Sequence, residues 1–228
     1  MIKFVFLDLD DTILDFHKAE YDAISDTLRT VGIEPTCDTV RLYSKINRAH
    51  WERLERGELT REQVLFGRFA TLFSKLGAEG SPEKTQEIYE ELLSANHPFM
   101  TDGRWLLDTL YGKYRLFVAS NGTAKVQDRR ISESNIGGYF EDIFISQRIG
   151  YDKPRPEFFE ACFQKIEGFS RDEAIIVGDS MTSDIIGGIR AGIKTCHFNH
   201  RGQENTLGYY PDFEIKTLRE LPDLLEKL

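Results

Sequence analysis

The sequence predicts an α/β protein whose parallel sheet is interrupted, shortly after its first strand, by an all-helical insertion. From Asp102 onward, short apolar runs alternate with helical patterns, as expected for parallel strands joined by crossover helices. One further apolar run, Phe4 to Leu7, stands alone near the N-terminus, and only helical periodicity follows it between His17 and Ala95. The length of 228 residues suits a main domain with one sizeable insertion. The expected division is a core of residues 1–15 and 98–228 and a helical insertion of residues 16–97.

The first apolar run is followed at once by acidic residues. Phe4 to Leu7 has the continuous apolar character of a strand that is buried on both faces of a parallel sheet. Asp8, Asp10 and Asp11 come directly after it. Open α/β sheets bind ligands beyond the carboxyl ends of their strands, so these carboxylates stand where chemistry is expected. They repel one another unless a cation or protons intervene.

The insertion is expected to contain four helices. The first ends before Gly32, and Thr36 or Asp38 can cap the second. Thr60 and Gln63 have the spacing of a capping box, in which each side chain satisfies a backbone donor of the other. The fourth helix opens at Ser81-Pro82-Glu83, with proline in the first turn, where its missing N–H is tolerated.

The remainder of the chain alternates between the two kinds of element. Strands are expected at residues 116–119, 143–145, 174–177, 195–198 and near Phe213, and helices at 105–111, 124–135, 156–166, 183–191 and from Leu218. The original domain therefore resumes after the insertion and completes the sheet.

Composition excludes several classes of partner. Hydrophobic residues make up 40% of the chain and charged residues 29%, and no apolar stretch is long enough to span a bilayer, so no membrane partner is expected. The net charge of -9 disfavours a nucleic-acid duplex, because binding to phosphate backbones depends on clustered Lys and Arg. A small phosphorylated metabolite with a bridging metal ion remains compatible with this charge. The protein is expected to act as a monomer or homodimer.

Cysteine usage and the N-terminus point to the cytoplasm. Cys37, Cys162 and Cys196 are odd in number and widely spaced, which argues against disulfides and zinc sites. Met1 leads straight into the first strand, with no segment that resembles a secretory signal. We therefore expect a cytoplasmic location and reduced thiols.

Polar residues follow the predicted strands at the edge where parallel strands end together. They are Asp8 and Asp10 after the first strand, Ser120 and Asn121 after the second, Lys153 beyond the third, and Asp179 with Asp184 after the fourth. Because these strands are expected to be parallel, the side chains should converge although they are far apart in sequence.

The converging groups suit magnesium and a phosphoryl group. Carboxylates of Asp8 and Asp179, a backbone carbonyl at Asp10 and several waters would match the octahedral oxygen coordination that Mg²⁺ prefers. Lys153 adds a compact positive charge, and Ser120 adds a hydroxyl donor. Together with a backbone donor at Asn121, these groups would surround the oxygens of a transferring phosphoryl group.

The ordered motifs resemble those of the haloacid dehalogenase (HAD) superfamily. They are Asp8-Leu-Asp10-Asp-Thr12, Ser120-Asn-Gly122, Lys153-Pro, and Gly178-Asp179 with Asp184. The resemblance spans the chain and implies a Rossmann-like parallel sheet core with an inserted helical cap domain. It further implies that Asp8 attacks phosphorus to form an aspartyl-phosphate, and that Asp10 protonates the leaving oxygen and later activates water.

The resemblance also implies which residues bind the metal and the phosphate. Catalytic roles fall to Asp8, Asp10, Ser120 and Lys153, metal binding to Asp8, Asp10, Asp179 and Asp184, and phosphate binding to Ser120, Asn121 and Lys153. Asp184 can act at the metal or as the partner of Lys153, and its alternative role is to cap the helix that follows.

A narrower resemblance reaches the substrate class. Asp15-Phe16, Ile46-Asn47 with Trp51, Thr60-Arg61, Arg68-Phe69 and the stretch from Gly178 to Asn199 are similar to the bacterial pyrimidine 5′-nucleotidases. This similarity implies a Mg²⁺-dependent phosphomonoesterase for nucleoside monophosphates, with a substrate pocket that includes Phe16, Asn47, Trp51 and Arg68. Alternatively, Trp51 and Phe69 could simply fill the cap core.

Other activities are compatible with parts of the pattern. Haloacid dehalogenases do not need the second acid, so Asp10 favours phosphoryl transfer, and a sugar-phosphate mutase would retain both acids. A phosphosugar or phosphoglycolate phosphatase is the alternative within the phosphatases. A phosphate-sensing module without turnover is the alternative outside enzymes.

Overall fold

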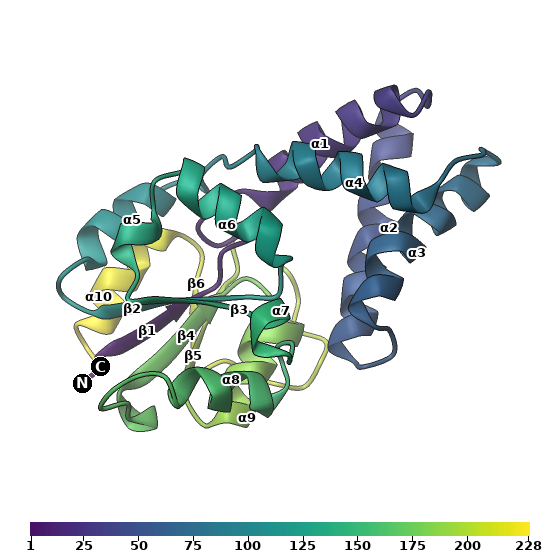
Figure 1. The fold of residues 1–228 in the computed structure, drawn as a ribbon. Coiled ribbons are helices and arrows are strands. Elements are labelled where there is room, and N and C mark those ends of the chain that lie inside the picture. Colours follow the sequence, from purple (N-terminus) through teal and green to yellow (C-terminus); the bar gives the residue numbers. More distant parts are fainter. The chain divides into compact units, whose positions relative to one another are not determined.

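The computed structural model describes all 228 residues and divides into two units. The core unit comprises Met1–Asp15 and Pro98–Leu228, and the cap unit comprises Phe16–His97. Figure 1 shows the sheet and its helices in the first and the helices of the second. No helix in the chain combines the length and apolar character needed to cross a membrane.

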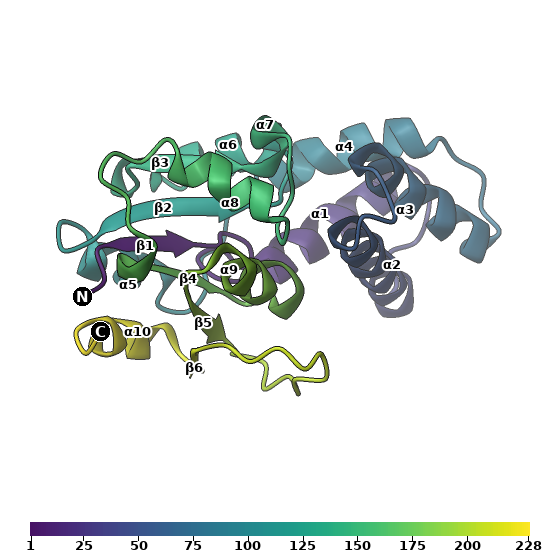
Figure 2. The same cartoon turned by 90° about the horizontal axis from the view of Figure 1, so that it is seen from below.

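The core unit is built on a six-stranded parallel sheet, which confirms the predicted fold class. The strands are β1 Phe4–Leu7, β2 Arg115–Ser120, β3 Asp142–Ile145, β4 Ala174–Gly178, β5 Lys194–Phe198 and β6 Phe213–Ile215. Their order is β3-β2-β1-β4-β5-β6, which Figure 2 shows from top to bottom. The central strand β1 therefore delivers the acidic residues between β2 and β4.

Alternating side chains of the strands feed two apolar layers. Val5 and Leu7 belong to one buried cluster, and Phe4 and Phe6 belong to another. The first cluster packs against three helices, α5 Gly103–Leu110, α6 Ala124–Glu133 and α10 Leu221–Leu225. The second cluster packs against two helices, α8 Pro156–Phe163 and α9 Ile186–Ala191 (Figure 1). Both faces of the sheet are thus covered, which explains why the strand runs are apolar throughout.

Two local features differ from the sequence-based expectation. A π-helical turn, Met181–Ile185, precedes α9, where one continuous helix was expected. In this turn Ile185 N–H bonds to Ser180 O, while Asp184 Oδ2 accepts from Ser180 N–H at 3.1 Å. The second feature is α7 Ser146–Ile149, a helix too short to show periodicity in sequence. The remaining short turns are 3₁₀ helices at Gly137–Tyr139, Arg171–Glu173 and Leu218–Glu220.

The cap unit consists of four helices, as the insertion pattern predicts. They are α1 Phe16–Thr30, α2 Cys37–Glu55, α3 Arg61–Leu76 and α4 Pro82–Ser94. The capping box between Thr60 and Gln63 is confirmed. An aromatic cluster of Tyr43, Phe69 and Tyr89, with ring centroids 5.4 to 5.7 Å apart, fills the interior.

Candidate active site

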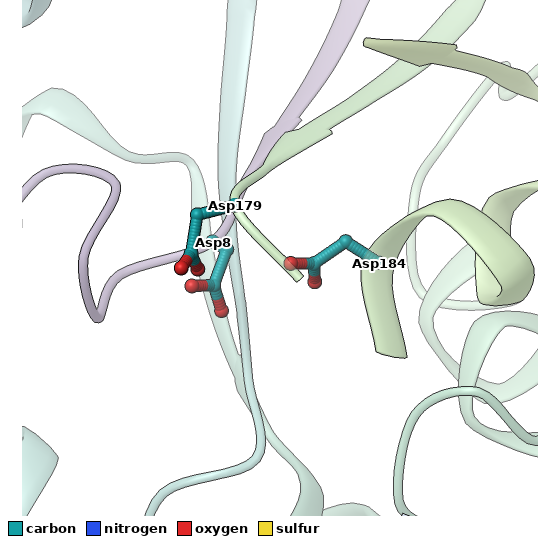
Figure 3. A group of neighbouring side chains, drawn as sticks. All are labelled: Asp8, Asp179 and Asp184. Atoms are coloured by element: carbon teal, nitrogen blue, oxygen red, sulfur yellow. The ribbon is translucent and has the colours of Figure 1, made fainter. Parts of the chain in front are cut away.

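Three carboxylates meet at the carboxyl end of the sheet. Asp8 follows β1, Asp179 follows β4, and Asp184 lies in the π-helical turn. One oxygen from each lies within 4.8 Å of the others. Figure 3 shows Asp8 and Asp179 side by side, with Asp184 facing them from the helical turn. The topology therefore brings together residues that are far apart in sequence.

Lys153 bridges two members of this acidic cluster. Its Nζ donates to Asp8 Oδ1 at 2.8 Å and to Asp184 Oδ1 at 2.6 Å, and its third hydrogen bond goes to Ala119 O. The side chain is only 1% exposed. Burial alone would lower the pKa of Lys153, but the charges of Asp184 and Asp8 outweigh it and raise the pKa above its ordinary value. Lys153 therefore stays protonated and orients Asp8.

One lysine does not balance three carboxylates. Burial raises the pKa of Asp8 to about 8, although Lys153 acts in the opposite direction. Burial, together with the charges of Asp11 and Asp8, raises the pKa of Asp179 well above its usual range. Both shifts signal a need for more positive charge at the cluster. An oxygen-only donor set of this kind suits a hard divalent cation.

Glycines in the motifs leave room for neighbouring polar side chains. A Cβ atom on Gly178 would lie 2.2 Å from Asp184 Oδ2, and one on Gly122 would lie 2.4 Å from Gln127 Nε2. Both distances are far below van der Waals contact. The glycines of the Ser-Asn-Gly and Gly-Asp motifs are therefore needed for close approach and not for an unusual backbone conformation.

Asn121 and Ser120 hold different parts of the site. The Asn121 side chain forms two hydrogen bonds to the backbone of Lys153, accepting from its N–H at 2.8 Å and donating to its carbonyl at 2.9 Å. This pair fixes the loop that carries the lysine. Ser120, which is 1% exposed, accepts hydrogen bonds from Gly122 N–H and from Gln127 Nε2. A role in phosphate binding for either residue remains a prediction.

Asp10 is held by residues that the sequence analysis missed. Its carboxylate forms an ion pair with Arg130 and accepts a hydrogen bond from Gln127 Nε2 at 2.7 Å. Arg130 is fully buried on α6. The available signal was the spacing of Gln127 and Arg130 on the helix face that also carries Val126 and Ile131. Asp11 lies outside this contact and pairs with Arg201 at 2.9 Å.

The predicted pocket residues occupy distinct environments in the cap unit. Asn47 and Arg68 are buried and joined by a hydrogen bond from Arg68 Nη1 to Asn47 Oδ1 at 2.7 Å. Trp51 is partly exposed and lies under the Arg61 guanidinium, 5.5 Å from the ring centroid. Phe16 is the first residue of α1 and is also partly exposed. Two of the four are therefore interior and two reach the surface of the cap unit.

The fold and this cluster of acids and lysine define a hydrolase class. The chain belongs to the haloacid dehalogenase-like hydrolases, whose family model matches residues 5–198. This membership confirms the predicted superfamily.

Relatives with assigned names span nearly the whole chain. The chain is 34% identical over 218 residues to the HAD-hydrolase YfnB of Bacillus subtilis, covering 96% of this chain and 93% of that protein. It is 34% identical to the pyrimidine 5′-nucleotidase PynA of Streptococcus pneumoniae, covering 99% and 95%, and 26% identical to the pyrimidine 5′-nucleotidase YjjG of Escherichia coli, covering 98% and 97%. A crystal structure of YfnB bound to magnesium superimposes with a TM-score of 0.94 and 33% identity, covering 98% of both chains.

Proposed function

We propose that this hydrolase is a Mg²⁺-dependent phosphomonoesterase that works through an aspartyl-phosphate on Asp8. The observation that carries the proposal is the pairing of two differently held carboxylates after one strand. Asp8 is 8% exposed and bonded to Lys153, whereas Asp10 is bonded to Arg130 and Gln127. Separate environments allow one carboxylate to act as nucleophile and the other as acid and base.

In the first step Asp8 is the nucleophile. Lys153 holds the carboxylate in place through Oδ1, and one oxygen of Asp8 attacks phosphorus. The bond between phosphorus and the leaving oxygen breaks, and that oxygen takes a proton from Asp10. The products are the free alcohol and a phosphoryl group bonded to Asp8.

In the second step a water molecule attacks the same phosphorus atom. Asp10, now a carboxylate, accepts a proton from the water, the bond from phosphorus to Asp8 breaks, and inorganic phosphate leaves. The net reaction consumes one water and returns both aspartates to their starting states.

Several groups would stabilise the negative charge on the phosphoryl oxygens. Asp8, Asp179 and Asp184, with the backbone carbonyl of Asp10, would hold Mg²⁺, since three carboxylate oxygens already lie within 4.8 Å of one another. When bound, the ion would supply positive charge that stabilises the phosphoryl oxygens. Ser120, the Asn121 backbone and Lys153 would provide hydrogen bonds to those oxygens.

The proposed substrates are nucleoside 5′-monophosphates, with pyrimidine nucleotides preferred. Support comes from PynA and YjjG, two relatives named pyrimidine 5′-nucleotidases. Within the proposed pocket, Trp51 and Phe16 keep exposed surface that can stack on a base. Asn47 and Arg68 are bonded to other cap side chains, so their contribution would include holding the pocket helices in place.

The mechanism and substrate class can be tested with one panel. Release of phosphate would be measured with Mg²⁺ for nucleoside monophosphates, sugar phosphates and phosphoglycolate, using wild type and Asp8→Asn. We expect pyrimidine nucleotides to be the best substrates and Asp8→Asn to lose activity by about 10⁴-fold or more, as for loss of a nucleophile. Asp172→Asn, on the exposed surface, should retain full activity.

Each other result would point elsewhere. Equal activity of wild type and Asp8→Asn would contradict the aspartyl-phosphate mechanism. A clear preference for sugar phosphates or phosphoglycolate would replace the substrate class but keep the mechanism. Undetectable hydrolysis together with measurable affinity for phosphate and Mg²⁺ would identify a phosphate-sensing module.

A further inference from the structure

Helix α6 presents two buried polar side chains to the site. Gln127 is 1% exposed and Arg130 is 0% exposed. Their spacing of three residues places both on the same face of the helix. Burial of a guanidinium is costly unless it is paired, so the location of Arg130 requires a partner. That partner is Asp10, the proposed acid and base.

The two residues bind both oxygens of the Asp10 carboxylate. Arg130 Nη1 contacts Asp10 Oδ1 and also donates to Gln127 Oε1 at 3.0 Å. Gln127 Nε2 donates to Asp10 Oδ2 at 2.7 Å. Each carboxylate oxygen has two lone-pair sites, so one site on each remains for the proton that is transferred. The contacts therefore restrict rotation of the carboxyl group without blocking its chemistry.

Gln127 also sets the direction of the Ser120 hydroxyl. Ser120 Oγ accepts from Gln127 Nε2 at 2.8 Å and from Gly122 N–H at 3.1 Å. A hydroxyl oxygen has two acceptor sites, and these two donors occupy both. The hydroxyl hydrogen is then left to donate in the one remaining direction. A Cβ atom on Gly122 would collide with the Gln127 amide, so the motif glycine admits this side chain.

We propose that Gln127 and Arg130 are positioning residues. They link Asp10, the proposed acid and base, to Ser120, the proposed hydrogen-bond donor to the phosphoryl group. This inference rests on the proposed function, because it assigns Asp10 to proton transfer and Ser120 to a phosphoryl oxygen. Arg130 holds Asp10 in the orientation that protonates the leaving oxygen. Gln127 joins Asp10 to Ser120, so that the proton donor and the hydroxyl donor keep a constant separation around one phosphoryl group.

Leaving-group dependence separates this role from a structural one. An alkyl monophosphate such as a nucleotide needs protonation of its leaving oxygen, whereas p-nitrophenyl phosphate has a good leaving group and needs little. The ratio kcat/KM reports events up to the first irreversible step, in which Asp10 acts as the acid. The variants are Arg130→Met, Arg130→Lys and the control Arg129→Met, whose side chain is 37% exposed and pairs with Glu133.

For Arg130→Met we expect kcat/KM to fall about 100-fold or more on the nucleotide, within the range for loss of general acid catalysis, and only a few-fold on p-nitrophenyl phosphate. Arg130→Lys should recover part of the nucleotide activity, and Arg129→Met should match wild type on both substrates. Equal losses on the two substrates, or no loss on the nucleotide, would overturn the role of Arg130.

Binding of inorganic phosphate tests the same link without turnover. Calorimetry with Mg²⁺ present would compare the phosphate affinity of wild type with that of Gln127→Leu. This comparison also tests the proposal if Arg130→Met does not fold. We expect affinity to fall about tenfold, as for one weakened hydrogen bond to a charged group. If wild type hydrolyses no monoester but Gln127→Leu still weakens phosphate binding, the proposed function fails and the positioning of Ser120 stands. Equal affinities, or no phosphate binding by wild type, would overturn the inference.

Discussion

Gly178 shows how a residue without a side chain contributes to the site. It ends β4, and any Cβ atom there would lie 2.2 Å from Asp184 Oδ2. Asp184 cannot yield easily, because it is fully buried and holds Lys153 and the Ser180 N–H. The motif glycine is therefore a steric requirement of the Lys153–Asp184 pair.

Replacement of Gly178 by alanine should impair activity more than stability. The new methyl group would displace Asp184 and, through Lys153, the proposed nucleophile Asp8. A shift of about 1 Å at a reacting group can reduce the rate by about 100-fold, and we expect a loss of that order in kcat/KM. Gly138→Ala is the control, because nothing lies within 4 Å of its added Cβ atom. Similar activity of both variants in the phosphate-release assay would contradict the steric argument.

At the scale of elements, the four cap helices are joined by one chain of buried polar side chains. Each helix contributes one residue: Glu20, Asn47, Arg68 and Gln86. Asn47 Nδ2 donates to Glu20 Oε1 at 2.6 Å, Arg68 Nη1 to Asn47 Oδ1 at 2.7 Å, and Arg68 Nη2 to Gln86 Oε1 at 2.6 Å. The Arg68 guanidinium also lies 4.8 Å from the Tyr89 ring centroid. Arg68 thus links two of the other three side chains in this hydrogen-bonded network.

Replacement of Arg68 by methionine should destabilise the cap unit. The change leaves the acceptors of Asn47 and Gln86 without their donor and removes the buried positive charge near Glu20. Loss of one member of a buried charged network lowers the free energy of unfolding by about 3 to 5 kcal/mol. Denaturant unfolding followed by far-UV circular dichroism would measure it. Arg41→Met, with an 81% exposed side chain, should change stability by no more than about 0.5 kcal/mol. Equal stabilities of the two variants would refute the network.

The Glu20 carboxyl should make cap stability depend on pH. Burial raises the pKa of Glu20 above its ordinary value of 4.5, although hydrogen bonds from Ser44 and Asn47 act in the opposite direction. The folded state therefore binds more protons than the unfolded state above pH 4.5, so stability falls as pH rises through this window.

Comparison with Glu20→Gln isolates this effect, because the amide does not titrate. The free energy of unfolding of wild type, minus that of Glu20→Gln, should be greatest below the ordinary pKa of the carboxyl. It should decrease above that pH by up to about 1.4 kcal/mol per pH unit until the folded-state pKa is passed. Denaturant titrations at half-unit steps from pH 4 to about 8 would follow it. A difference that stays constant over this range would contradict the raised pKa.

At the scale of the whole molecule, we expect the acidic cluster to couple metal binding to folding. Burial is the main cause that raises the pKa of Asp8 and of Asp179, and the charges of neighbouring carboxylates add to it. A cation that binds only the folded state stabilises it by mass action. At a Mg²⁺ concentration about 100 times the dissociation constant, the free energy of unfolding should rise by about 2.7 kcal/mol.

This stabilisation should depend on the acidic cluster. Thermal unfolding of the core unit in the full chain, with Mg²⁺ or with a chelator, would measure the change in Tm. The increase should be much smaller in Asp179→Asn, which removes one of the three carboxylates. An identical increase in both proteins would show that the ion binds elsewhere.

The sequence predicted the sheet well because its strands are short, apolar and contiguous. Parallel topology then aligns their ends, so the convergence of Asp8, Asp179 and Asp184 followed from strand order. Contacts that depend on packing were not accessible. Arg129 and Arg130 are identical neighbours in the sequence, yet one side chain is 37% exposed and the other 0%. Arg130 lies on the helix face that carries Val126 and Ile131, but its ion pair with Asp10 appears only when α6 packs against the sheet.

The π-helical turn and the cap interior were hidden for related reasons. The turn depends on the hydrogen bond between Asp184 and Ser180, which is formed by tertiary placement of Asp184 beside Lys153. In the cap, Asn47 lies four residues after Tyr43 and Arg68 four after Val64, so helical periodicity places both polar side chains on a buried face without showing what satisfies them there. Their burial depends on mutual satisfaction of hydrogen bonds, which appears only when the helices are packed.

The core chain closes on itself where the cap unit is inserted. Asp15 N–H donates to Pro98 O at 2.8 Å, Met100 N–H donates to Ile13 O at 3.0 Å, and Leu14 bridges Phe99 in antiparallel fashion. The segments that leave the core and return to it are thus held together by backbone contacts between core residues alone. For the core, any segment inserted there is a loop whose ends are already joined, and loop-closure entropy grows only slowly with length. The scaffold can therefore accept a different inserted module without rerouting a strand, so that, if the cap selects the substrate as proposed, specificity can change while the proposed catalytic aspartates stay in place.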